Sequence, residues 1–285
     1  MNSDSVERAR VSRGTWAPEL RGKTAIVTGA GRLRSIGRPI ALELARQGVN
    51  VIVVGTGRDP STYPADEREL GWRDIESVAA EIGDVGAKAL PIVCDITDPG
   101  AVDRLMALAA EHFGPIDILI NNAGAARAGD RTSLIDLSLA DWSRVMGTNL
   151  TGALHMSQSV ARQMVARGTG GCIVNISSVA ARRASANMGA YSASKTALNT
   201  ISRTLAMELA CHKIRVNAVL PGTIETSRLD DIGRGARWQA TVDEVPLGVA
   251  GNGLEVAYMC TFLCSDMGAW ITGQDIAVDG GMSWH

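Results

Sequence analysis

This chain has few aromatic residues, almost no excess of charge of either sign and no long apolar run. Aromatic residues make up 4% of its 285 residues, and the net charge is −2. No apolar run approaches the roughly eighteen residues that a membrane-spanning helix needs. The balanced charge gives no electrostatic attraction to nucleic acid or to an anionic membrane surface. We therefore expect neither a nucleic-acid partner nor a membrane partner.

Cysteine is present but does not follow the patterns of metal sites or disulfide frameworks. The five cysteines are odd in number and scattered along the chain, and the four histidines are dispersed. Cys260 and Cys264 lie four residues apart, but in an apolar helical segment and without a second Cys/His pair. We expect these thiols to pack in the core. The sequence predicts no metal site and a reducing compartment, the cytoplasm.

Short apolar runs of strand length alternate with segments of helical periodicity along the chain. The runs are rich in Val and Ile and nearly continuous, as in strands buried on both faces. They predict one α/β domain over residues 21–285, a doubly wound, seven-stranded parallel sheet with helices on both faces. Residues 1–20 are polar and are predicted to be a loose tail rather than a signal peptide. The predicted strands are Thr24–Thr28, Asn50–Val54, Lys88–Cys94, Ile116–Ile120, Gly171–Ser177, Ile214–Leu220 and Gln274–Val278.

Two segments interrupt this alternation. Residues 57–73 form a long, Pro-containing connection after the second predicted strand. Residues 223–250 separate the sixth strand from the last helix, where loops at the carboxyl ends of strands shape substrate sites. The second segment is therefore a candidate substrate lid, with a plain surface excursion as the alternative.

A Gly-rich turn joins the first predicted strand to a predicted amphipathic helix. It reads Thr28-Gly29-Ala30-Gly31-Arg32-Leu33-Arg34-Ser35-Ile36-Gly37. Backbone N–H groups at a helix amino end bind phosphate, and glycines let the chain approach a pyrophosphate closely. A tight connection without a ligand is the alternative, but the position between strand and helix favours a phosphate site.

Three further motifs follow in order. Asn121-Asn122-Ala123-Gly124 ends the fourth predicted strand, Ser178 ends the fifth, and Tyr191 precedes Lys195 by one helical turn. With the Gly-rich turn, they resemble the short-chain dehydrogenase/reductase family in its common short form, over about residues 20 to 283. The resemblance implies a Rossmann-like fold, a nicotinamide cofactor and a small-molecule ketone or alcohol substrate. It also implies a homotetramer, or a homodimer, built through helices near residues 138–167 and 191–212 and the last strand.

The resemblance assigns catalytic roles to four residues. Tyr191 is the general acid in reduction and the base in oxidation, which requires its pKa to fall by about three units. Lys195 provides the positive charge for that shift and holds the nicotinamide ribose. Ser178, thirteen residues before Tyr191, donates a hydrogen bond to the substrate oxygen. Asn149 distorts its helix and holds a water that passes protons to Lys195; a solvated asparagine is the alternative.

The family pattern also indicates the residues that contact the cofactor. This chain departs from the usual Thr-Gly-x-x-x-Gly-x-Gly, because two residues are inserted and Ser35 replaces the middle glycine, so the loop must follow another path. Asn121 is expected to face the cofactor and Asn122 to hold the sheet. Asp95 is expected to cap the adenine, with a turn-forming role as the alternative. The full set is Gly29, Gly31, Arg34, Ser35, Ile36, Gly37, Thr56, Arg58, Asp95, Ile96, Asn121, Ala123, Gly124, Tyr191, Lys195, Pro221, Gly222, Thr223 and Thr226.

The end of the second predicted strand favours NADP(H) over NAD(H). No acidic residue ends this strand to accept a hydrogen bond from a ribose 2′-hydroxyl. Arg58 offers a planar fork for a 2′-phosphate, Arg34 matches a position that is often basic in NADP-dependent relatives, and Thr56 adds a hydroxyl donor. The alternatives are that these arginines are solvated, or that Asp59 reaches a ribose and NAD(H) is used.

The substrate itself cannot be read from the sequence. The candidate pocket residues form a moderately apolar set. Arg182 and Arg183 are expected to be solvated, with contact to an anionic substrate as the alternative. Enoyl-thioester reduction, sugar epimerisation or dehydration, and a regulator that binds the cofactor without turnover are the alternatives to alcohol–carbonyl interconversion. The candidate pocket residues are Ala180, Asn187, Met188, Leu229 and Trp238.

Overall fold

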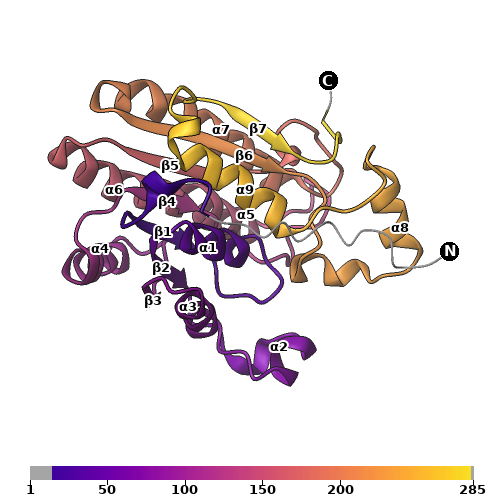
Figure 1. The fold of residues 1–285 in the computed structure, drawn as a ribbon. Coiled ribbons are helices and arrows are strands. Elements are labelled where there is room, and N and C mark those ends of the chain that lie inside the picture. Colours follow the sequence, from indigo (N-terminus) through magenta and orange to yellow (C-terminus); the bar gives the residue numbers. More distant parts are fainter. Residues whose placement is uncertain (1–14, 284–285) are drawn as a thin grey trace.

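One parallel sheet of seven strands forms the centre of the protein (Figure 1). The computed structural model describes residues 15–283, and the strands are ordered β3-β2-β1-β4-β5-β6-β7. Every predicted strand is present, so the predicted Rossmann-like α/β fold is confirmed. The strands are β1 (Thr24–Thr28), β2 (Asn50–Gly55), β3 (Ala89–Val93), β4 (Ile118–Asn121), β5 (Gly171–Ile176), β6 (Ile214–Pro221) and β7 (Asp275–Val278).

Helices cover both faces of the sheet. They are α1 (Gly37–Arg46), α2 (Ala65–Glu69), α3 (Ile75–Asp84), α4 (Pro99–Phe113), α5 (Leu139–Met146), α6 (Ala153–Arg167), α7 (Gly189–Leu209), α8 (Ala236–Asp243) and α9 (Gly253–Cys264). Val27 and Ile120 pack on one face against α1, α3 and α9, and the alternating Ile26 and Leu119 pack on the other against α4, α6 and α7. Within residues 15–283, no helix is long and apolar enough to cross a membrane.

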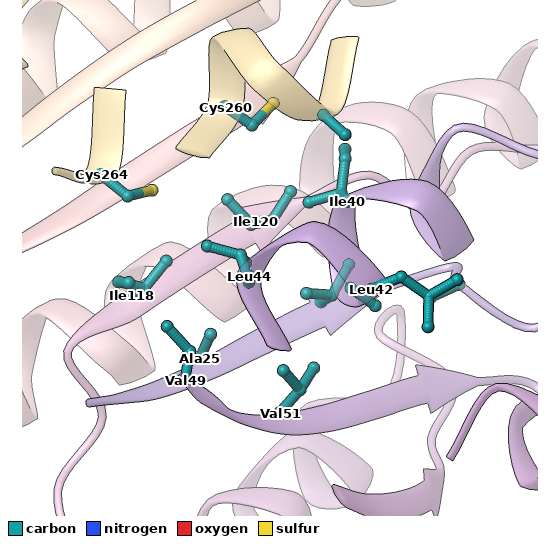
Figure 2. Packing of buried hydrophobic residues seen from close by; sticks show 14 of the residues in the cluster. Ala25, Ile40, Leu42, Leu44, Val49, Val51, Ile118, Ile120, Cys260 and Cys264 are labelled. Carbon is teal, nitrogen blue, oxygen red and sulfur yellow. The ribbon is translucent and has the colours of Figure 1, made fainter. Parts of the chain in front are cut away.

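Helix α1 is held between the sheet and α9. Figure 2 shows Ile40 and Leu44 of α1, Ile120 of β4, and Cys260 and Cys264 of α9, which belong to one buried cluster. The two cysteines are 0% and 4% exposed, so the prediction that they pack in the core is confirmed. Because the Gly-rich turn leads directly into α1, this packing fixes the end of the turn against the sheet.

The described part of the predicted loose tail is packed against the fold. Residues 1–14 lie outside the described residues, but Ala17 and Leu20 are fully buried. The indole nitrogen of Trp16 donates to Glu43 at 2.9 Å, and the Ala17 amide donates to Gln47 at 3.0 Å. A loose tail as far as residue 20 is therefore wrong, because apolar side chains in this stretch cover the outer side of α1.

The long connection between β2 and α3 braces the Gly-rich turn. Its short helix α2 carries Glu67. One carboxylate oxygen of Glu67 accepts a hydrogen bond from the Leu33 amide at 2.9 Å, and its other carboxylate oxygen lies 3.0 Å from the Arg58 guanidinium. The indole of Trp72 donates to the Gly31 carbonyl at 2.6 Å. The lengthened Gly-rich turn and the long connection therefore support each other.

Replacing Glu67 by Ala should lower the free energy of unfolding by about 2 kcal/mol, because it leaves the Leu33 amide without its acceptor and removes one of the two carboxylates that pair with Arg58. Glu67 is 1% exposed. Glu69→Ala, an exposed acid in the same helix, is the matched control and should change stability by less than about 0.5 kcal/mol. Urea unfolding of the three proteins provides the comparison. Equal stability of the two variants would contradict the bracing role.

Candidate active site

Six strands end at one cavity of about 1060 Å³. They are β1 to β6, whose carboxyl ends lie on the same edge of the sheet. β1 and β4 are neighbours although β2 and β3 come between them in the chain, so the order of the strands reverses here. Open α/β sheets bind ligands at such a reversal point.

Most of the predicted cofactor residues line this cavity, and two do not. The exceptions are Gly37 and Asn121, which lie behind its wall. Asp95 lines the cavity, and its carboxylate accepts from the Thr97 amide and hydroxyl at 2.9 and 2.8 Å, so its turn-forming role is present. The predicted residues that line the cavity are Gly29, Gly31, Arg34, Ser35, Ile36, Thr56, Arg58, Asp95, Ile96, Ala123, Gly124, Tyr191, Lys195, Pro221, Gly222, Thr223 and Thr226.

The expected orientation of the two neighbouring asparagines is reversed. Asn121 is 3% exposed, and its amide donates to Asn175 at 2.8 Å and to Ser157 at 2.9 Å, which ties β4 to β5 and α6. Asn122 lines the cavity and donates to the carbonyl groups of Thr28 and Gly29, both at 2.9 Å. Successive side chains of a strand point to opposite sides, so only one of the pair can face the cavity.

The lengthened Gly-rich turn brings backbone close to the neighbouring strand. Gly29 has φ +66°, and a Cβ there would lie 2.7 Å from the Ala123 Cα, so only glycine fits. At Gly37, a Cβ would meet the Asn122 amide at 2.5 Å, which makes this glycine a packing residue. Ser35 does not have a positive φ; its hydroxyl donates to the Arg32 carbonyl and accepts from the Arg38 amide at the start of α1. Ser35 thus needs no positive φ in this loop, and a path that differs from the glycine form stays a prediction.

Tyr191 and Lys195 lie one turn apart on α7 and face the end of β5. The Lys195 ammonium is 5.9 Å from the centre of the Tyr191 ring and donates to the Ile176 carbonyl at 2.7 Å. The Ser178 hydroxyl lies near enough to the Tyr191 phenol to contribute to the lowering of its pKa. Ser177 is turned away, and its hydroxyl donates to the Lys195 carbonyl at 3.2 Å. Of the two neighbouring serines, Ser178 is therefore the one in position to share a substrate oxygen with the phenol.

The surroundings of Tyr191 favour its phenolate. Burial acts in the opposite direction, but the charge of Lys195, the charge of Arg228, the hydrogen bond from Ser178 and the charge of Arg131 together lower the pKa of the phenol. For the Lys195 ammonium, burial lowers the pKa, and the attraction between the ammonium and Tyr191 offsets part of this effect. A phenol with a lowered pKa exchanges protons nearer neutrality than a free tyrosine does.

Asn149 lies in a π-helical turn, η3 (Gly147–Gly152), between α5 and α6. The predicted local distortion of the helix is therefore present. The residue is 1% exposed, its amide oxygen accepts from the Ala125 amide at 2.8 Å, and its amide nitrogen donates to Ser194 at 3.0 Å. Its side chain thus ties α7 to the loop after β4, which excludes the solvated alternative. Its role in proton transfer stays a prediction.

The substrate end of the cavity is more basic than the sequence suggested. Ala180, Met188 and Leu229 line it as predicted, but Asn187 and Trp238 do not. The prediction is wrong for Asn187, which is exposed in a turn at φ +61°, and for Trp238, whose ring lies under Arg234. The segment 223–250 forms one wall, as the lid hypothesis requires, although closure stays a prediction. Arg183, for which contact with an anionic substrate was the alternative to solvation, lines the cavity. So do four arginines that we did not single out as contacts: Arg127, Arg131, Arg144 and Arg228.

Both arginines that were expected to meet a 2′-phosphate are engaged in ion pairs. Arg34 contacts Asp66 and Asp230, each at 2.6 Å. Arg58 contacts Glu67 at 3.0 Å and Asp74 at 2.8 Å. β2 does not end in an acidic residue, but Asp74 places a carboxylate in the same region. Its Oδ1 lies against the Gly-rich turn, only 2.0 Å from where a Cβ on Gly31 would be. Sequence reasoning missed it because it follows the long connection rather than the strand.

The residues present fit a dinucleotide. The turn from Gly29 to Ile36 opens onto the cavity at the start of α1, and Gly222 leaves no room for a side chain, because a Cβ there would lie 2.7 Å from the Asp279 Cα. One continuous cavity connects these points with Tyr191. The fold and the cavity together define a dinucleotide-binding oxidoreductase.

Known proteins support that class. A sequence profile described as Enoyl-(Acyl carrier protein) reductase matches residues 29–283. The chain is 36% identical to L-rhamnose 1-dehydrogenase (NAD(P)(+)) of Azotobacter vinelandii, over 91% of this chain and 96% of that protein. It is 34% identical to 7alpha-hydroxysteroid dehydrogenase of Escherichia coli strain K12, over 92% and 94%. A crystal structure of 7 alpha-hydroxysteroid dehydrogenase with NADH and 7-oxo glycochenodeoxycholic acid matches with a TM-score of 0.81 and 34% identity, over 93% and 96%.

The chain therefore belongs to the short-chain dehydrogenase/reductase family. It is an NAD(P)-dependent oxidoreductase that acts on a CH–OH or C=O group.

Proposed function

We propose that this protein interconverts a secondary alcohol and its carbonyl compound, with Tyr191 as the general acid and base. The observation that carries the proposal is the Tyr191 phenol, which lines the same cavity as Ser178 and the Gly-rich turn and whose pKa Lys195 lowers from 5.9 Å away. Relatives named as dehydrogenases of L-rhamnose and of a 7alpha-hydroxysteroid support it.

Each residue has a distinct task in this reaction. The Ser178 and Tyr191 hydroxyl groups hold the substrate oxygen; the Tyr191 phenolate takes the hydroxyl proton in oxidation, and the phenol returns it in reduction. Lys195 stabilises the phenolate and would hold the nicotinamide ribose. Pro221 and the residues after it would hold the nicotinamide, and the start of α1 the pyrophosphate. The nicotinamide, when bound, accepts the hydride from the alcohol carbon or returns it to the carbonyl carbon.

Enoyl-thioester reduction is the second candidate, because the matching profile carries that description. Divergent enoyl reductases space their tyrosine and lysine more widely than Tyr191 and Lys195. The Ser178 hydroxyl, moreover, faces the phenol, where a carbonyl or hydroxyl oxygen would be held. These two features favour alcohol–carbonyl chemistry.

Tyr191→Phe should lower kcat by roughly 10²–10⁴-fold, because only the proton-transferring hydroxyl is removed. Cofactor affinity, measured by nicotinamide fluorescence, should change by less than about threefold. The assay uses a panel of secondary alcohols and ketones with both nicotinamide cofactors, and crotonyl thioester as the enoyl substrate. Turnover of the thioester alone, or a Phe variant with near wild-type kcat, would contradict the proposal.

For the cofactor, we propose that NADP(H) is preferred and that Arg32 is the principal contact of the 2′-phosphate. Within residues 15–283, Arg32 has no ion-pair partner, and it lines the cavity beside Thr56. Burial and the charge of Arg58 lower its pKa, which indicates a cation without a full counter-charge. A phosphate would supply that charge. Asp74 is the opposing feature, but its carboxylate is already paired with Arg58.

The ratio of kcat/KM with NADPH to that with NADH measures this preference. Arg32→Gln should lower the ratio by about tenfold or more, and should weaken NADPH binding without weakening NADH binding. Arg21→Gln, at an exposed arginine outside the cavity, is the control. A wild-type preference for NADH, or an unchanged ratio in Arg32→Gln, would contradict the assignment.

We also propose a homotetramer that uses α7 and the last strand. Met207 on α7 is 82% exposed, and Met267 and Trp270 before β7 are 52% and 100% exposed. Burial of these apolar side chains against a second copy would remove them from water.

A further inference from the structure

Two arginines from distant parts of the chain lie over the ring of Tyr191. The Arg131 guanidinium is 4.7 Å from the ring centre, and the Arg228 guanidinium is 5.1 Å away. Arg131 lies in the loop after β4, and Arg228 lies in the 3₁₀ helix η6 (Ser227–Ile232). Both line the cavity together with Ser178, so a substrate whose oxygen reaches Tyr191 passes beside both.

These two cations are not neutralised by the residues that the structure describes. The Arg228 side chain donates to the Ala125 carbonyl at 2.6 Å and has no carboxylate partner in that part of the chain. The nearest carboxylate to Arg131 is Asp130, 3.5 Å from its Nε, and Asp130 is bound more closely by Arg144 at 3.0 Å. Nε and Nη1 of Arg131 are buried and have no hydrogen-bond partner. Among the described residues, Arg131 therefore has only a carboxylate that Arg144 binds more closely, and Arg228 has none.

Such an arrangement costs free energy unless an anion joins it. The Arg131 side chain is only 16% exposed, and buried charges without partners are strongly unfavourable. Burial, followed by the charge of Arg228, lowers the pKa of Arg131, although Asp130 and the Tyr191 phenol act in the other direction. Stacking on the ring recovers part of this cost. The remaining guanidinium N–H groups can bind a carboxylate in bidentate fashion.

The other charged groups nearby do not change this balance. Arg127 is paired with Asp231 at 2.6 Å, and Arg183 lies 3.8 Å from Glu244. Lys195 adds a further positive charge beside the phenol. Asp130, Asp231 and Glu244 therefore each pair with an arginine other than Arg228.

We propose that the substrate is an anion, a hydroxy acid or its keto acid, whose carboxylate is held by Arg131 and Arg228. This inference rests on the proposed alcohol–carbonyl reaction and adds the substrate class. Since both guanidinium groups lie beside the ring of the catalytic phenol, the carboxylate is within a few bonds of the carbon that is oxidised. The reaction itself is unchanged: hydride leaves this carbon for the nicotinamide, the hydroxyl proton goes to Tyr191, and a keto acid remains.

The kinetic test compares acids with their neutral amides. Lactate, β-hydroxybutyrate and gluconate are each assayed against the matching primary amide. For at least one pair, the acid should have a kcat/KM about tenfold or more above the amide. Arg228→Gln should remove most of this difference, because it raises KM for the acid and not for the amide, and Arg228→Lys should rescue it in part. The effect of Arg228 on the Tyr191 pKa falls on kcat for acid and amide alike, so it cancels in the ratio of the two kcat/KM values. Arg131→Gln should act in the same way, and Arg21→Gln should not.

A binding measurement separates this inference from the proposed function. Calorimetry with malonate and the NADPH-bound protein should show binding that Arg228→Gln weakens about tenfold or more and Arg21→Gln leaves unchanged, whether or not any alcohol is oxidised. If acids and amides are turned over equally, the substrate class is wrong while the reaction stands. The inference is also overturned if inorganic phosphate binds more tightly than malonate, which would indicate a phosphate ester.

Two further results would reassign the arginines. If the variants weaken NADPH rather than malonate, the anion is the cofactor pyrophosphate. If they shift the pH midpoint of turnover equally for acid and amide and leave KM unchanged, the arginines act only on the Tyr191 pKa. Either result contradicts a substrate carboxylate site.

Discussion

The site depends on keeping the Tyr191 phenol in the field of several cations while the protein removes it from water. Burial alone would raise the pKa of the phenol and make it a poorer base. Lys195, Arg228 and Arg131 reverse that effect, and Ser178 adds a hydrogen bond to the phenolate. The cations come from α7, from the loop after β4 and from the segment after β6, so the acidity of one hydroxyl depends on three separate parts of the chain.

The fold holds these parts in place by pairing strands and bracing loops. The parallel register of β4, β5 and β6 brings their carboxyl ends to one edge, and the hydrogen bond between Asn121 and Asn175 joins β4 to β5 behind the site. Asn149 then joins α7 to the loop after β4 through Ser194 and Ala125. On the other side of the cavity, Glu67 and Trp72 hold the lengthened Gly-rich turn. Both ends of the cavity are thus fixed by buried polar contacts.

The sequence predicted the sheet, because nearly continuous Val- and Ile-rich runs leave few alternatives, and it predicted that Ser178, Tyr191 and Lys195 lie together. It failed where placement depends on contacts between distant segments. The orientations of Asn121 and Asn122 were assigned the wrong way round, because two adjacent identical residues give no indication of which one faces the cavity. Arg58 was expected to be available for a 2′-phosphate. The long connection after β2 instead brings Glu67 and Asp74 into contact with it, and no local sequence pattern predicts the path of that connection. Arg131 and Arg228 were missed because they lie 97 residues apart in the chain, on either side of Tyr191.

The most direct test is an ultraviolet titration of the Tyr191 phenolate. The chain has three tyrosines, so subtracting the titration of Tyr191→Phe from that of the wild type isolates one phenol. The account predicts a phenolate signal with a midpoint below the ordinary value of 10.0, and a midpoint that moves upward in Lys195→Met because one positive charge is lost. A midpoint at or above 10.0 in the wild type, or one that Lys195→Met leaves unchanged, would contradict it.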